Sequence, residues 1–107
     1  MTDASHPDEN IRVVRDNEHN RYRIEVDGQT AGFTQFRQDG DRLRFVHTEV
    51  DEAYSGRGLA KTLVAQAMAD VADHGETVIP LCPYVATFLR RNEVSGLKVH
   101  WPAESEE

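Results

Sequence analysis

The fold of this chain is decided by one stretch of its sequence, Val50-Asp51-Glu52-Ala53-Tyr54-Ser55-Gly56-Arg57-Gly58-Leu59-Ala60-Lys61-Thr62-Leu63. A strand-like segment, residues 43–50, leads into this stretch, and a helical pattern over residues 58–74 follows it. A glycine-rich turn between a strand and a helix start presents backbone N–H groups at the positive end of the helix dipole. The stretch is therefore a predicted binding site for a phosphate or pyrophosphate. It lacks the third glycine of a dinucleotide-binding loop and the Gly-Lys-Ser/Thr of a P-loop.

The helix that follows the glycines is the clearest element in the sequence. Its apolar residues recur every four positions, at Leu59/Ala60, Leu63/Val64, Ala67/Met68 and Val71/Ala72. This spacing predicts an amphipathic helix over residues 58–74 that packs on a sheet. Gly75 is expected to end it.

The remaining segments predict an α+β domain, a mostly antiparallel sheet with two helices. Period-two alternation and turn signals predict four consecutive strands, over residues 11–14, 22–26, 31–35 and 43–48. A fifth strand is expected at 77–79, a second helix at 84–91 with Pro83 in its first turn, and a last strand over 97–101. We expect the strands in 43–50 and 77–80 to be parallel with a right-handed crossover. Because no helix fits between the early strands, we expect one face of the sheet to be poorly covered. We expect the protein to be a monomer or a weak homodimer, which would cover that face.

The stretch Ser55-Gly56-Arg57-Gly58-Leu59-Ala60 resembles motif A of the GNAT superfamily, the acyl-CoA-dependent N-acetyltransferases. Ser55 departs from the family pattern, which has Arg or Gln there. Two further segments, Val78 to Val85 with its Cys-Pro-Tyr-Val and His47-Thr48-Glu49-Val50, resemble a small single-domain GNAT-like branch. The resemblance spans residues 43–92. It implies a compact GNAT-like fold, acetyl-CoA as cosubstrate and transfer of an acetyl group to an amine.

The resemblance also implies which residues hold the cosubstrate. They are Val50, Ser55, Gly56, Arg57, Gly58, Leu59, Ala60, Lys61 and Thr62. Backbone N–H groups of the loop would cradle the pyrophosphate, and Gly56 and Gly58 would let the anion approach. Arg57 and Lys61 either add charge near the phosphates or belong to a solvated helix face.

Three residues are candidates for the chemistry: Cys82, His47 and Glu49. Cys82 precedes Pro83 at a predicted helix start, where the dipole would favour a thiolate that accepts or orients an acetyl group. The alternative is a small buried apolar residue. His47 and Glu49 lie two apart in a strand and so share a face, where either could remove the ammonium proton. The alternatives are a core histidine and a carboxylate paired with a neighbouring arginine.

Tyr54 and Tyr84 are candidate proton donors to the leaving thiolate, with core packing as the alternative reading. The wider family often has a tyrosine one turn into the last helix, but that helix here reads Val85-Ala86-Thr87-Phe88-Leu89-Arg90. That role therefore has no counterpart in this sequence. The histidines show no ligand spacing, so we predict no metal site.

Composition narrows the class of protein. The chain has 107 residues, which suits one domain, predicted at 10–102 between a disordered N-terminus (1–9) and an acidic tail (103–107). Its net charge of −7 argues against nucleic acid as a partner and is compatible with a cationic acceptor, or with solubility alone. One cysteine, no apolar run of bilayer length and an acidic start without a hydrophobic block predict a cytoplasmic protein without a membrane partner.

We therefore expect an acetyl-CoA-dependent N-acetyltransferase whose acceptor is an amine, on a small molecule or a protein lysine. The alternatives are a non-enzymatic acyl-CoA-binding module and a small interaction domain for a basic partner. No motif identifies the acceptor.

Overall fold

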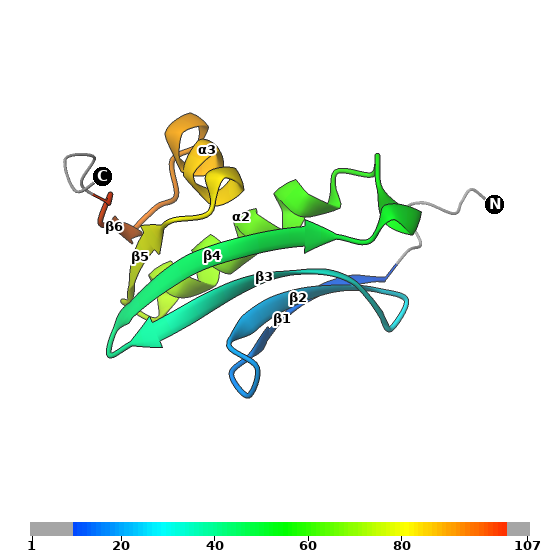
Figure 1. Cartoon of the computed structure of the whole chain (residues 1–107), viewed down its shortest axis with the longest axis horizontal. Helices are drawn as coiled ribbons and strands as arrows, with labels where there is room; N and C mark the ends of the chain where they lie inside the picture. The colour runs from blue at the N-terminus through cyan, green and yellow to red at the C-terminus, as the bar shows by residue number, and fades with distance from the viewer. Residues whose placement is uncertain (1–9, 103–107) are drawn as a thin grey trace.

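The computed structural model describes residues 10–102, so the disordered segment predicted at 1–9 and the acidic tail predicted at 103–107 lie outside the described residues. The chain forms one six-stranded sheet whose strands lie side by side in sequence order (Figure 1). The strands are β1 (Ile11–Asp16), β2 (Arg21–Val26), β3 (Gln29–Asp39), β4 (Arg42–Val50), β5 (Thr77–Pro80) and β6 (Lys98–Val99). Neighbours from β1 to β4 are antiparallel, while β5 is parallel to both β4 and β6.

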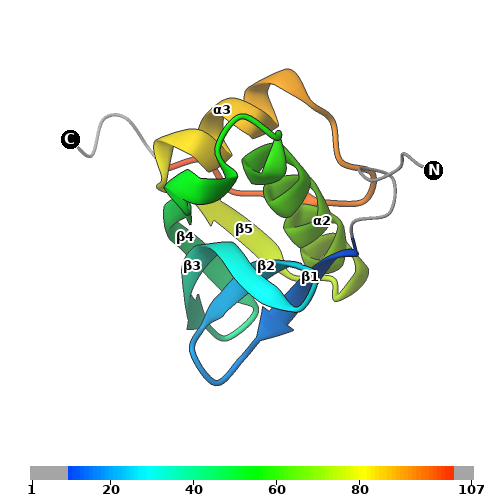
Figure 2. The same cartoon turned by 90° about the vertical axis from the view of Figure 1, so that its right-hand side faces the viewer.

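Two helices complete the fold, α2 (Leu59–Asp73) and α3 (Pro83–Arg91), with a short 3-10 helix at Glu52–Tyr54. The sheet curls around α2, and α3 lies alongside it (Figure 2). Both helices contribute to a single core with the sheet. Its fully buried larger side chains are Tyr22, Ile24, Phe36, Leu43, Phe45, Leu63, Val64, Met68, Val71, Val78 and Val85. The predicted α+β architecture is confirmed, and so is the parallel pairing of the strands around α2, with Leu43 opposite Val78.

We call the sheet face of β1–β4 that points away from α2 the outer face. In β2, Tyr22, Ile24 and Val26 are buried against the helices, whereas Arg21, Arg23 and Glu25 alternate onto the outer face. Ion pairs line that face, among them Arg23–Glu25 at 3.1 Å and Arg12–Glu25 at 3.9 Å. Charged side chains therefore cover much of the face without helices, where they surround the half-buried Phe33.

The last strand is shorter than its sequence pattern predicts. Alternation over residues 97–101 predicts a strand through Trp101, but only Lys98–Val99 pairs. The strand is short because its partner strand β5 is only four residues long and pairs with β6 through Thr77 and Val78 alone. Trp101 is 42% exposed. The Arg90 guanidinium lies over it, 5.3 Å from the centre of the Trp101 ring.

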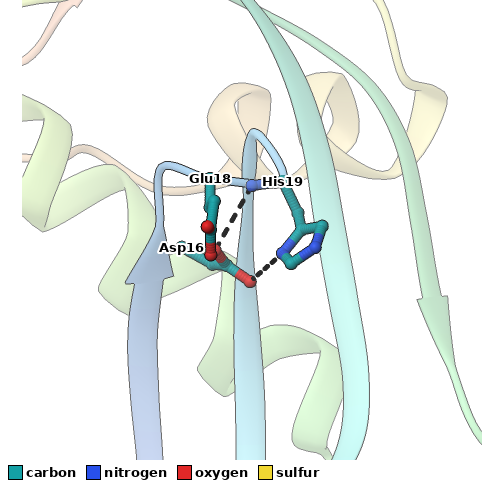
Figure 3. A group of neighbouring side chains, drawn as sticks. All are labelled: Asp16, Glu18 and His19. Carbon is teal, nitrogen blue, oxygen red and sulfur yellow. Dashed lines mark hydrogen bonds and ion pairs between the residues drawn. The ribbon is translucent and has the colours of Figure 1, made fainter.

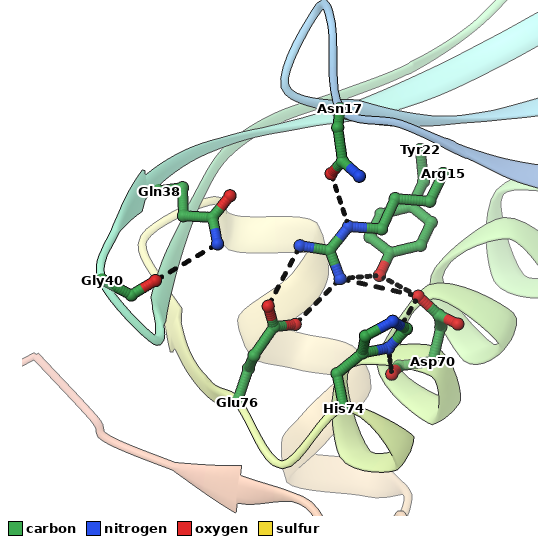
Figure 4. Close-up of polar contacts among 8 residues, drawn as sticks. All are labelled: Arg15, Asn17, Tyr22, Gln38, Gly40, Asp70, His74 and Glu76. Atoms are coloured by element: carbon green, nitrogen blue, oxygen red, sulfur yellow. Dashed lines mark hydrogen bonds and ion pairs between the residues drawn. The ribbon is translucent and has the colours of Figure 1, made fainter.

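A partly buried polar network fastens β1 and β2 to the end of α2 and the start of β5 (Figure 4). Arg15 makes two hydrogen bonds to Glu76, of 2.8 and 3.1 Å, and Tyr22 donates one of 2.6 Å to Asp70. His74, after the last residue of α2, contacts the Asp70 carbonyl at 2.8 Å. The bond to Glu76 raises the pKa of Arg15, and burial raises the pKa of Tyr22. The network holds Arg15 charged and Tyr22 neutral.

Candidate active site

The parallel strands β4 and β5 separate part-way along β4. Their pairing ends at Phe45 opposite Pro80, and the N–H groups of Leu81 and Cys82 both donate to the Phe45 carbonyl, at 3.0 and 2.7 Å. Beyond that point β4 continues to Val50 and pairs with β3 alone. The strand pairing is thus broken between the end of β4 and the start of α3, and we call this break in the sheet the opening.

The glycine loop forms the start of α2 at the far end of β4. Gly56 and Gly58 have φ angles of 81° and 73°, a left-handed conformation that favours glycine. Gly58 is the N-cap of α2, without a side-chain cap, and the first helical bond runs from the Thr62 N–H to the Gly58 carbonyl at 3.2 Å. The N–H groups of residues 59–61 therefore have no partner within the helix. Nothing lies within 4 Å of a Cβ built on either glycine, so a side chain there would project into this open space.

The polar residues of the loop differ in how they are engaged. The Arg57 guanidinium lies 5.5 Å from the centre of the Tyr54 ring. Lys61 is exposed in the first turn of α2, and the Thr62 hydroxyl donates to the Gly58 carbonyl at 3.3 Å. Ser55 is exposed, and its N–H donates to the Glu52 carbonyl.

Apolar side chains anchor the loop at both ends. Leu59 is 3% exposed and belongs to the core, and Val50 packs against the same cluster while Ala60 is half-buried. These residues were predicted to contact the cosubstrate. The inward packing of Leu59 and Val50 leaves their backbone atoms for that contact.

Cys82 lies at the other side of the opening, as the N-cap of α3 with Pro83 in the first turn. Its thiol is 5% exposed and contacts the Thr48 hydroxyl at 3.4 Å, which in turn lies 2.8 Å from the hydroxyl of buried Thr34. Cys82 is therefore buried, as the structural alternative describes, and it also stands at the predicted helix start, while its role toward the acetyl group stays a prediction. The sequence did not single out the two threonines.

His47 and Glu49 lie together on the outer face of β4, with His47 Nε2 3.0 Å from Glu49 Oε1. Their side chains are 57% and 58% exposed, which rules out the core-histidine reading, and Glu49 pairs with His47 rather than with an arginine. Thr48, the residue between them, points to the opposite side and meets Cys82. The three predicted catalytic residues thus lie on two sides of β4.

A small pocket of about 190 Å³ lies between the first turn of α2 and α3. Lys61 lines it from α2, and Tyr84, Phe88 and Arg91 line it from α3. It brings two cationic side chains next to the uncapped helix start. The sequence did not identify Arg91 as a site residue, because thirty positions separate it from Lys61 and no motif connects the two.

The two candidate tyrosines lie apart from the thiol contacts. The Tyr54 hydroxyl donates to Gln29 at 3.4 Å, and Tyr84 is 41% exposed on α3. Tyr54 is half-buried and packs against the core, as the core-packing alternative describes, whereas Tyr84 is exposed. A role for either as a proton donor stays a prediction.

Asp16, Glu18 and His19 gather at the turn between β1 and β2, with side-chain atoms close enough to share a metal ion (Figure 3). Asp16 is already engaged, because His19 lies 2.8 Å and Arg23 3.1 Å from the same carboxylate oxygen. The hydrogen bond with His19 lowers the pKa of Asp16. This carboxylate is surrounded by cationic partners, so we assign no metal site to the turn.

The order of strand, glycine loop, helix, strand and Cys-Pro helix matches a known family. The family profile for GCN5-related N-acetyl-transferases covers residues 21–96. The chain belongs to this family. Protein NATD1 of Bos taurus is 30% identical over 84 residues, which are 77% of this chain and 74% of that protein. Protein NATD1 of Xenopus tropicalis is 27% identical over 94 residues, which are 86% of each chain.

Solved structures show the same fold. A protein from Staphylococcus aureus assigned to the GCN5-like N-acetyltransferases superposes with a TM-score of 0.64 at 15% identity, over 89% of this chain and 93% of that one. A protein from Deinococcus radiodurans R1 assigned as an acetyltransferase gives 0.55 at 16% identity, over 99% and 95%. Neither helix within residues 10–102 has the length and apolar composition that crossing a bilayer requires.

Proposed function

We propose that this chain is an acetyl-CoA-dependent N-acetyltransferase that acts on a primary amine. The observation that carries the proposal is the opening between β4 and β5, with the uncapped start of α2 on one side and Cys82 on the other. The donor supplies an activated acetyl group, and the chain must bind it, position it and deprotonate the acceptor. Family membership and the glycine loop support this assignment.

The start of α2 would bind the pyrophosphate of the donor. Backbone N–H groups of residues 59–61 and the positive end of the helix dipole favour an anion there. Lys61 and Arg91, which line one pocket, would add positive charge for the remaining phosphate group. The side chains of Val50 and Leu59 fix the loop through the core.

Groups on both sides of β4 would serve the transfer of the acetyl group. The N–H groups at the start of α3 favour negative charge that develops near Cys82. Thr48 holds the Cys82 sulfur at 3.4 Å, whether the thiol accepts the acetyl group or lines its binding site. On the outer face, the pair of His47 and Glu49 would take the proton of the acceptor ammonium.

Release of the CoA thiol in the presence of an amine panel tests this function. We expect release that depends on both acetyl-CoA and an amine. Acetyl-CoA binding without release would instead support an acyl-CoA-binding module, and absence of binding would support an interaction domain.

A further inference from the structure

A second pocket, of about 490 Å³, opens at the end of β4 next to Glu49. Nine residues line it: Arg21, Thr30, Ala31, Gly32, Phe33, Glu49, Val50, Asp51 and Glu52. Because the side chains of Arg21 and Glu49 belong to the outer face, this pocket lies across the sheet from α2. It is therefore separate from the pocket that Lys61 and Arg91 line between the helices.

One end of this pocket is negative. Glu49 is more than half exposed and paired with His47, and Glu52 is exposed in the 3-10 helix. Asp51 accepts the Ala53 N–H through one oxygen, at 2.9 Å. Three carboxylates in one pocket wall favour an ammonium group over a neutral or anionic one.

The other end is positive. The Arg21 side chain is 31% exposed, and its one ion pair among the described residues is a 3.7 Å contact with Asp16. Asp16 is shared with Arg23 and His19. The Arg21 Nε is buried and makes no hydrogen bond within residues 10–102. The guanidinium is thus incompletely paired where it lines the pocket.

Phe33 lies between the two ends. Arg21 is 5.3 Å from the centre of its ring, and the His47 ring is 6.0 Å away. Arg21 lies opposite Gln35 and Glu49 lies opposite Phe33. The two backbones are therefore two inter-strand spacings apart across the sheet and two residues apart along it, roughly 12 Å in all. The half-buried Phe33 ring offers an apolar surface for an alkyl chain that bridges them.

We propose that the acceptor is a small zwitterion with a primary ammonium and a carboxylate at opposite ends of an alkyl chain, an ω-amino acid. The ammonium lies toward Glu49, the carboxylate binds Arg21, and the chain rests on Phe33. The identification as acceptor rests on the proposed function, because it takes Glu49 and His47 as the proton-removing pair. Because the Phe33 ring lies between the two ends, an alkyl spacer between the two charges gains an apolar contact that an α-amino acid lacks.

Isothermal titration of the full chain with three matched probes tests the pocket without requiring turnover. The probes are 6-aminohexanoate, 1-aminohexane and hexanoate. We expect 6-aminohexanoate to bind at least tenfold more tightly than either compound with a single charge. Arg21→Met should abolish that advantage, Arg21→Lys should restore part of it, and Arg12→Met, an exposed arginine in neighbouring β1, should leave it intact.

Equal affinities for 6-aminohexanoate and 1-aminohexane, no binding of any probe, or an advantage that survives Arg21→Met would overturn the proposal. If Arg21→Met does not fold, the affinities of the three probes for the unmodified chain and for Arg21→Lys still test the proposal. The proposed function is judged separately. Acetyl transfer to 1-aminohexane without preference for the zwitterion would refute this inference alone. Zwitterion binding without any transfer would refute the proposed function, and with it the role of the zwitterion as acceptor, but not the binding pocket.

Discussion

The two ends of the unit formed by β4, α2 and β5 are held together in opposite ways. Where α2 ends, Arg15, Tyr22, Asp70 and Glu76 form a largely buried network with close, directed hydrogen bonds (Figure 4). Where α2 begins, the N-cap is Gly58, which has no side chain, and the helix start carries no side-chain cap. At the end of α2 the polar groups bond to one another and stabilise the fold. At the start of α2 the backbone N–H groups have no side-chain cap and are available to a ligand.

This difference predicts that substitutions at the two ends have separable effects. Those at the network end should lower the free energy of unfolding and leave donor affinity unchanged. Those at the loop end, or at the opening beside it, should change binding or turnover in a folded protein.

The largest effect on stability is expected for Glu76→Ala. Both hydrogen bonds from Arg15 are lost, which leaves a guanidinium that is 12% exposed with Asp70 at 3.7 Å as its remaining carboxylate. Removing one partner of such a pair should cost about 3 kcal/mol. Urea unfolding measures this cost.

Asp39→Ala is the matched control, because it breaks the exposed Arg44–Asp39 contact at 3.6 Å. We expect a change within about 0.5 kcal/mol there. Equal losses in the two variants would show that the network does not fasten this end.

The next effect concerns turnover at Cys82. Cys82→Ala and Cys82→Ser should reduce acetyl transfer about tenfold or more with little change in acetyl-CoA affinity, because the thiol lies beside the opening rather than at the phosphate cradle. Cys82 is the single cysteine of the chain, so iodoacetamide labels it alone. Saturating acetyl-CoA should slow that alkylation. An equal rate with and without the donor would remove Cys82 from the site.

A smaller effect is expected for Tyr22→Phe. The lost hydrogen bond to Asp70 should cost about 1 kcal/mol at neutral pH. Burial raises the pKa of folded Tyr22, whereas in the unfolded chain Tyr22 ionises near pH 10. Stability of the unmodified protein should therefore fall as the pH rises above about 10. The phenylalanine variant should show a shallower fall, and identical alkaline slopes in urea unfolding would contradict this reading of the network.

The sequence predicts the loop end better than the network end. Gly56, Gly58 and the four-residue repeat of α2 are local signals, and they correctly place the loop, the helix and the parallel strands. The network has no local signal, because sixty-one positions separate Arg15 from Glu76 and tertiary packing brings them together.

The sequence predicts only part of the candidate site, because the rest depends on tertiary packing that leaves no local signal. The register of β4 decides that Thr48 contacts Cys82 while His47 and Glu49 point to the opposite face. The pairing of β4 with β3 is irregular between Gln35 and Phe36, and the alternation of residue types in the sequence does not indicate this irregularity. Arg21, Thr34 and Arg91 reach their pockets or contacts from other elements. Their roles follow from how strands and helices pack and could not be predicted from spacing.

The central claim is that the start of α2 binds the pyrophosphate of acetyl-CoA, and isothermal titration of Gly58→Val with acetyl-CoA tests it most directly. Gly40→Val is the control, because Gly40 has a similar φ of 64° and equally open surroundings but lies in the turn between β3 and β4. We predict that Gly58→Val weakens binding by tenfold or more, at least ~1.4 kcal/mol, while Gly40→Val leaves the affinity unchanged. Unchanged affinity in a folded Gly58→Val protein would contradict the claim.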